Sequence, residues 1–177
     1  MSTPAMSEFA KLIKEYREKK SSKLIYNASI EHAHDLFSEL FKEAEETKAN
    51  VHIVSGQLTE DFYGRFSDTI KKIIDKGVHV QLAVLNPAVA LEKHPFVMSI
   101  LKGNGQVFQA DNEVDTPHYI LVGDRCFRLE TDHGKAKAVA SFNNPDIAAK
   151  LKLHFNSLIQ QSYMKKHTCR AEKTPTP

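Results

Sequence analysis

The sequence contains no tryptophan and only two cysteines. Cys126 lies in an apolar run and Cys169 in a polar tail, so neither a disulfide framework nor a cysteine-based zinc site is expected. The histidines are also too scattered for zinc, because no pair has the spacing of a metal site on one helical face. We therefore expect a protein of a reducing compartment, in the cytoplasm, that uses no metal and no cofactor.

Long apolar runs are missing too. No segment approaches the ~20 apolar residues that a membrane-spanning helix needs, and residues 1–20 do not read as a secretory signal. The glycine-rich nucleotide-binding loops and the Gly-x-Ser-x-Gly turn of many hydrolases are absent as well. We therefore expect no transmembrane segment and none of these common enzyme classes.

The sequence has no large excess of positive or negative charge, because 24 Lys and Arg residues are nearly balanced by 22 Asp and Glu residues. The net charge of +2 does not demand an anionic partner, although it allows a local basic patch. With 177 residues, of which 41% are hydrophobic, the chain has the size and composition of one globular domain with a single core.

Apolar periodicity predicts alternating helices and strands. Helices are expected at residues 5–19, 29–47, 59–76 and 87–102, and from Pro145 onward. Strands are expected at residues 23–26, 51–54, 78–85, 106–109, 118–122, 125–130 and 135–142. A strand, a helix and a strand with short connections predict a parallel pair, and Gly123-Asp124 predicts the turn of an antiparallel hairpin.

The chain is expected to have three parts. Residues 1–20 form an amphipathic helix that lies on the main body or on a partner. Its apolar stripe consists of Phe9, Leu12, Ile13 and Tyr16. Residues 21–164 form the main α/β domain, and residues 165–177 form a flexible polar tail.

The order of these elements, with a few short phrases, points to a family. Lys76-Gly-Val-His-Val80 is followed by Gly103 to Val107, and then by a strand that begins with His118, a hairpin, another strand and a closing helix. Over residues 23–162 this order resembles one module of the phospholipase D superfamily. The resemblance implies an α/β fold, a phospholipase D-like sandwich with a mixed parallel and antiparallel β-sheet and helices on both faces.

The superfamily signature is H-x-K-x4-D (the HKD motif) followed by G-S-x-N, and two copies build one phosphodiesterase site. The resemblance implies that one histidine attacks phosphorus, a second protonates the leaving group, and Lys, Ser and Asn hold the phosphoryl oxygens. Here His118 matches the histidine, but Ile120 stands at the lysine position and Arg125 at the aspartate position. Ala140 to Asn143 reads Ala-Ser-Phe-Asn and departs from G-S-x-N only at its first residue. The HKD motif is therefore degenerate.

The missing lysine matters because a phosphoryl-transfer transition state spreads negative charge over its oxygens, where fixed cations increase the rate. Strand alternation places Lys137, Ser141 and Asn143 on one face, so Lys137 is a candidate replacement cation. Arg128 and Glu130 share a face of the preceding strand. They are candidate ligand-binding residues or, as the simpler interpretation, an ion pair.

The other candidates also have structural interpretations. His118 either lines a phosphate-sized pocket or is a hydrogen-bonded structural histidine. Ser141 and Asn143 either bind an anion or end the strand and cap the helix that begins at Pro145. Lys137 either reaches a phosphate or lies in solvent at a strand end.

The sequence leaves three alternative hypotheses for the function. The first is a degenerate phospholipase D-like domain, a pseudoenzyme without turnover, that binds a phosphate-bearing ligand or nucleic acid through His118, Ser141 and Asn143, or regulates a partner. The second is an active, metal-independent phosphodiesterase or nuclease that works as a homodimer with two copies of His118. The third is a protein-interaction domain that uses the N-terminal helix.

Overall fold

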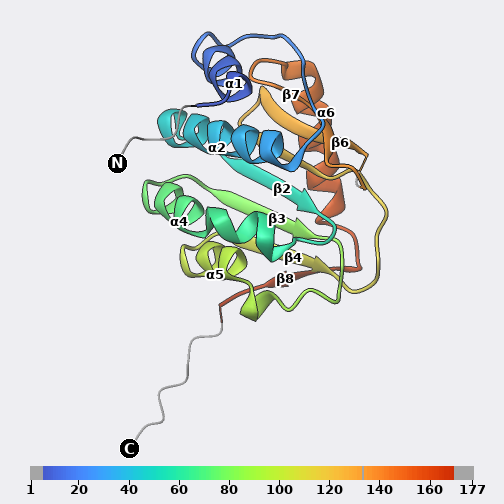
Figure 1. Cartoon of the computed structure of the whole chain (residues 1–177). Helices are drawn as coiled ribbons and strands as arrows, with labels where there is room; N and C mark the ends of the chain where they lie inside the picture. The colour runs from blue at the N-terminus through green and yellow to red at the C-terminus, as the bar shows by residue number, and fades with distance from the viewer. Residues whose placement is uncertain (1–5, 133, 170–177) are drawn as a thin grey trace, which may run out of the picture.

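The computed structural model describes residues 6–132 and 134–169. Within these residues, eight strands form one sheet in the order β1-β7-β6-β5-β2-β3-β4-β8 (Figure 1). In chain order, the strands are β1 (Ile25–Asn27), β2 (Val51–Ser55), β3 (Val80–Val84), β4 (Gln106–Ala110), β5 (Tyr119–Val122), β6 (Cys126–Asp132), β7 (Lys137–Ser141) and β8 (Met164–His167). The helices, with η for a 3-10 helix, are α1 (Glu8–Glu18), α2 (Ile30–Thr47), α3 (Glu60–Tyr63), η1 (Gly64–Phe66), α4 (Ser67–Asp75), η2 (Leu91–Lys93), α5 (Pro95–Lys102) and α6 (Pro145–Leu158).

The sheet is mixed, as predicted. Strands β2, β3 and β4 are parallel to one another, and the remaining neighbours in the sheet are antiparallel. β5 and β6 form the expected hairpin, in which Gly123 has the positive φ of +63° that a tight turn requires. β2 is thus flanked by parallel β3 on one side and antiparallel β5 on the other.

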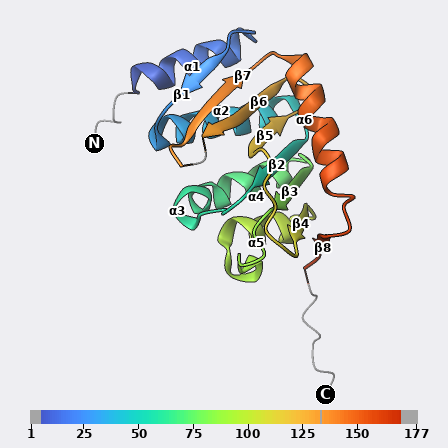
Figure 2. The ribbon, with the colours of Figure 1, turned by 90° about the vertical axis from the view of Figure 1, so that its right-hand side faces the viewer.

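Helices cover both faces of the sheet (Figure 2). Strand alternation explains the two buried clusters, because neighbouring residues of one strand point to opposite faces. In β2, Ile53 belongs to the cluster shared with α2, α4 and α5, whereas Val54 belongs to the cluster shared with α6. The predicted mixed sheet with helices on both faces is confirmed.

Capping residues determine where the helices α2 and α6 begin. The Ser29 hydroxyl accepts a hydrogen bond from the His32 N–H at 3.1 Å and caps α2. Asn144 does the same for α6, where its side chain accepts from the Ile147 N–H at 3.1 Å and Pro145 occupies the first turn. No helix in the described part of the chain is both long enough and apolar enough to cross a membrane.

The helix expected over residues 59–76 is broken into α3, η1 and α4. Glycine is a poor helix former, and Gly64 lies at the first break, where its carbonyl accepts a hydrogen bond from the Ser67 hydroxyl at 2.8 Å. The break places Phe66 in the core, 6% exposed, while Arg65 stays on the surface.

The flexible tail expected from residue 165 is wrong for residues 165–167, because they belong to β8 and pair with β4. Met164 anchors this strand in the core, whereas Lys165 and Lys166 are exposed. Lysines are typical of edge strands, where their charge prevents pairing with other chains. Residues 170–177 of the expected tail lie outside the described residues, as do residues 1–5 of the N-terminal segment.

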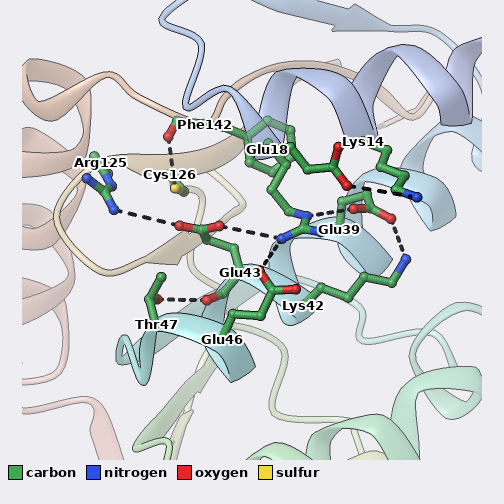
Figure 3. A network of polar contacts seen from close by, with 11 residues as sticks. Lys14, Glu18, Glu39, Lys42, Glu43, Glu46, Thr47, Arg125, Cys126 and Phe142 are labelled. Atoms are coloured by element: carbon green, nitrogen blue, oxygen red, sulfur yellow. Dashed lines mark hydrogen bonds and ion pairs between the residues drawn. The ribbon is translucent and has the colours of Figure 1, made fainter.

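The N-terminal helix lies on the main body and is held there by a buried ion-pair network (Figure 3). Arg17 of α1 is 7% exposed, and its Nε donates to Glu39 Oε2 of α2 at 2.7 Å. Its Nη1 donates to Glu46 at 2.5 Å and lies 3.9 Å from Glu43. Ile13 is fully buried, so the apolar stripe of α1 mostly covers the body of the protein.

Candidate functional site

A cleft of about 520 Å³ lies where β2 ends and β5 begins. In α/β sheets, ligands bind beyond the carboxyl ends of parallel strands, where neighbouring connections diverge. The lining residues come from the start of α2, from the end of β2 through η1, from β6, and from the residues directly before β5 and β7. They are Ile30, Ala33, His34, Ser55, Gln57, Leu58, Thr59, Asp61, Phe62, Tyr63, Arg65, His118, Arg128, Glu130 and Ala136.

His118 lies directly before β5, with its Nδ1 3.4 Å from Glu130 Oε2 of β6. The backbone supports this pair, because the Glu130 N–H donates to the His118 carbonyl at 2.9 Å. A carboxylate at Nδ1 favours the tautomer with its proton there and its lone pair on Nε2. Such an imidazole can accept a hydrogen bond or attack an electrophile.

Gly56 makes room for this imidazole. A Cβ added to Gly56 would lie 2.4 Å from Cε1 and 2.6 Å from Nε2 of His118. The glycine is therefore needed for close approach to His118.

Arg128 lines the cleft, is 2% exposed, and donates one hydrogen bond from each of its three guanidinium nitrogens to a local network. Nε donates to Asn27 Oδ1 of β1 at 3.1 Å, and Nη1 donates to Glu130 Oε1 at 3.3 Å. Nη2 and the Asn27 amide both donate to the Ala136 carbonyl, at 3.3 and 2.7 Å. The charge of Arg128 is therefore balanced by Glu130, and the expected ion pair of these two residues is present.

The segment after β2 forms a wall with a fixed backbone. The Ser55 hydroxyl accepts from the Leu58 N–H at 3.2 Å, and the Leu58 carbonyl lies 2.8 Å from Nε2 of buried His94. Leu58 has a φ of 47° and Ala136, also at the cleft, a φ of 51°. Non-glycine residues in this left-handed region carry local strain, which is common at functional sites.

Aromatic rings and a second arginine complete this wall. His34 of α2 stacks on Phe62 of α3 with a centroid distance of 4.6 Å, and Arg65 Nη1 lies 3.4 Å from His34 Nδ1. Burial, and then the positive charge of Arg65, lower the pKa of His34. Burial raises the pKa of Tyr63 to about 12, so this phenol stays protonated and can donate a hydrogen bond.

Three of the residues singled out in the sequence do not line the cleft. Lys137 and Ser141 alternate with Ala138 and Ala140 along β7, and Ala140 faces the α2 side together with the cleft. Lys137 and Ser141 therefore point to the opposite face of the sheet from His118. The Ser141 hydroxyl accepts from the Asn143 N–H at 3.2 Å, a contact at the strand end.

The sequence resemblance places Ile120 at the lysine position of the motif, and the surroundings of this side chain are apolar. Ile120 is fully buried in the cluster under α2, on the same face of β5 as His118. Across residues 6–132 and 134–169, no group of three or more His, Cys, Asp or Glu side chains is arranged to hold a metal ion.

Comparisons with known proteins identify the fold. No protein-family model and no curated protein matches the chain. Among solved structures, NucT from Helicobacter pylori matches 78% of this chain and 96% of its own chain, with a TM-score of 0.59 and 14% identity. A phosphatidylserine synthase from Haemophilus influenzae matches 82% of this chain, with a TM-score of 0.56 and 14% identity. Both are phospholipase D-superfamily proteins. The chain has the phospholipase D-like fold.

The phospholipase D-like fold of this chain also resembles TrmBL2, an archaeal chromatin protein whose structure shows a novel mode of DNA binding. The match covers 84% of this chain, with a TM-score of 0.58 and 14% identity. The chain spans 58% of the TrmBL2 chain and 39% of the synthase chain. At this identity the likeness concerns the fold alone.

Proposed function

We propose that this phospholipase D-like domain binds a phosphate-bearing ligand in the cleft around His118 and has no phosphodiesterase turnover. The observation that carries the proposal is the charge of the cleft floor. Ile120 buries an apolar side chain where the motif has its lysine, and the nearby cation, Arg128, is paired with Glu130. A transition state that gains negative charge would find no unbalanced buried cation at this floor among the described residues.

The same floor is suited to binding. His118, Arg128 and Glu130 are held by hydrogen bonds and ion pairs, so little side-chain entropy is lost when a ligand arrives. The fold-level likeness to NucT, a phospholipase D-like nuclease, and to DNA-binding TrmBL2 supports nucleic acid as one ligand to test.

The test measures turnover and binding of bis(p-nitrophenyl) phosphate, together with fluorescent DNA and RNA, in metal-free buffer. We expect no turnover above background, and weaker binding in His118→Ala than in the wild-type protein. His79→Ala is the matched control, because His79 is exposed and does not line the cleft. Turnover that disappears in His118→Ala would overturn the proposal, and so would wild-type binding by His118→Ala.

One observation favours a second candidate, an active phosphodiesterase or nuclease. The Glu130 carboxylate beside Nδ1 is the arrangement that orients a histidine for nucleophilic attack. One chain supplies one His118 at the cleft, so this candidate needs a homodimer in which a two-fold axis brings two His118 residues together. Light scattering in the assay buffer decides it: a monomer without turnover removes this candidate.

A further inference from the structure

The cleft contains a second arginine, Arg65. Arg128 is paired with the carboxylate of Glu130, whereas Arg65 has a different environment. Arg65 of η1 is exposed and lines the cleft. It forms no ion pair with a carboxylate among the described residues, although exposed Asp61 lines the same cleft. Its one hydrogen-bond contact there is the 3.4 Å contact between Nη1 and His34 Nδ1. Within residues 6–132 and 134–169, no other hydrogen bond engages the five guanidinium N–H donors.

The backbone that carries Arg65 is well anchored. Phe66, the next residue, is buried, and the Ser67 hydroxyl donates to the Gly64 carbonyl at 2.8 Å. The broken helix thus fixes the Cα of Arg65 at the cleft and leaves its side chain free to reach a ligand. A guanidinium is planar and can donate two parallel hydrogen bonds to a phosphate group.

The surroundings of Arg65 are apolar and aromatic. Ile30 at the start of α2 is 56% exposed, although it is a large apolar side chain, and Phe62 lies in the same wall. Burial and then the charge of Arg65 lower the pKa of His34, which disfavours a second positive charge beside Arg65. This wall therefore presents one cation next to apolar surface.

We propose that Arg65 is the phosphate-contacting cation of the cleft and that the ligand is an organic phosphate whose apolar or aromatic substituent contacts Ile30 and Phe62. The proposal rests on the proposed function, since it assumes that the cleft binds phosphate. It assigns to Arg65 the charge that the sequence suggested for Lys137, which lies on the other face of the sheet.

The experiment measures by calorimetry the dissociation constants of bis(p-nitrophenyl) phosphate and of inorganic phosphate for the whole chain. Arg65→Ala is expected to weaken binding of bis(p-nitrophenyl) phosphate about tenfold or more, as for the loss of one charge-assisted contact. Arg65→Lys is expected to retain part of the affinity, because it keeps the charge but not the planar fork. Lys137→Ala, another exposed cation removed, is the matched control and is expected to bind as the wild type does.

The outcomes separate this inference from the proposed function. If His118→Ala weakens binding and Arg65→Ala does not, Arg65 makes no phosphate contact and the inference fails alone. Equal losses of affinity in Arg65→Ala and Lys137→Ala would indicate a general effect of charge, and would also overturn the inference. If the wild-type protein binds neither probe, both proposals fail. Equal affinity for inorganic phosphate and the aromatic diester would overturn the assigned ligand class.

Discussion

Gly56→Ala is the sharpest test of the geometry around His118. The new Cβ would lie 2.4 Å from Cε1 of His118, whereas ordinary contacts begin at 3.4 Å. The imidazole must therefore move by about 1 Å, the difference between these two distances. Because the colliding atoms are at the end of a side chain, we expect the ring to rotate, which breaks its 3.4 Å contact with Glu130.

The expected effects on stability and on binding differ in size. Alanine in place of glycine restricts the unfolded chain and stabilises a protein by about 0.4–1 kcal/mol, while an off-rotamer ring costs about 0.5–1.5 kcal/mol. The free energy of unfolding should therefore change by less than ~1 kcal/mol. Loss of one hydrogen bond from His118 to the ligand weakens binding by about tenfold.

The prediction is tested by comparing the His118 NMR resonance and the affinity for bis(p-nitrophenyl) phosphate between Gly56→Ala and the wild-type protein. Gly64→Ala is the matched control, because its new Cβ would meet Glu60 Cγ at an ordinary 3.4 Å. Gly64 has a helical φ of −56°, so we expect this control, which is compared for stability alone, to be slightly stabilised. Gly56→Ala with an unshifted His118 resonance and wild-type affinity would refute the reasoning.

Three further predictions concern stability, all measured by urea unfolding. Arg17→Ala removes the buried cation that lies beside both Glu39 and Glu43, and should cost about 3–5 kcal/mol. Lys42→Ala removes the exposed partner of Glu39 and should cost less than ~1 kcal/mol; equal losses of stability would contradict this. Lys48→Gly should add about 0.5–1 kcal/mol, because Lys48 ends α2 with a φ of 57°; a loss of stability would count against it. Burial lowers the pKa of His52 from 6.5 to about 4, so the unfolded state takes up the proton first as the pH falls. Stability should decrease by about 2 kcal/mol between neutral pH and pH 5, and a His52→Leu variant with an equal decrease would exclude His52 as the cause.

Much of the fold could be predicted because it depends on local signals. The hairpin at Gly123 and the start of α6 at Pro145 are determined by neighbouring residues, and both are found where the sequence indicated. The break at Gly64 was missed because a single glycine is tolerated in a helix when tertiary packing supports it. The strand at Met164 was missed because an edge strand of lysines has no apolar alternation to detect.

The cleft was less predictable from the sequence, because its residues are far apart in the chain and are brought together by strand pairing in the sheet. Asn27 and Arg128 are in contact, although 101 positions separate them in the chain. The match of Ser141 to the motif did not predict a place at the cleft, because alternation along β7 turns this side chain to the face of the sheet opposite His118. Arg65 has no distinguishing neighbours in sequence, so its place at the cleft follows only from the break between α3 and α4.

The position of β1 at the edge of the sheet sets the order in which the cleft can form during synthesis. β1 is made early, but its partner in the sheet is β7, where Tyr26 faces Val139. Asn27 cannot hold Arg128 until β7 has left the ribosome and the edge has closed. Contacts so distant in sequence form slowly, because the chain loses loop entropy before they are made. A nascent chain that ends before β7 would therefore contain His118 and Arg128 but not the assembled floor of the cleft.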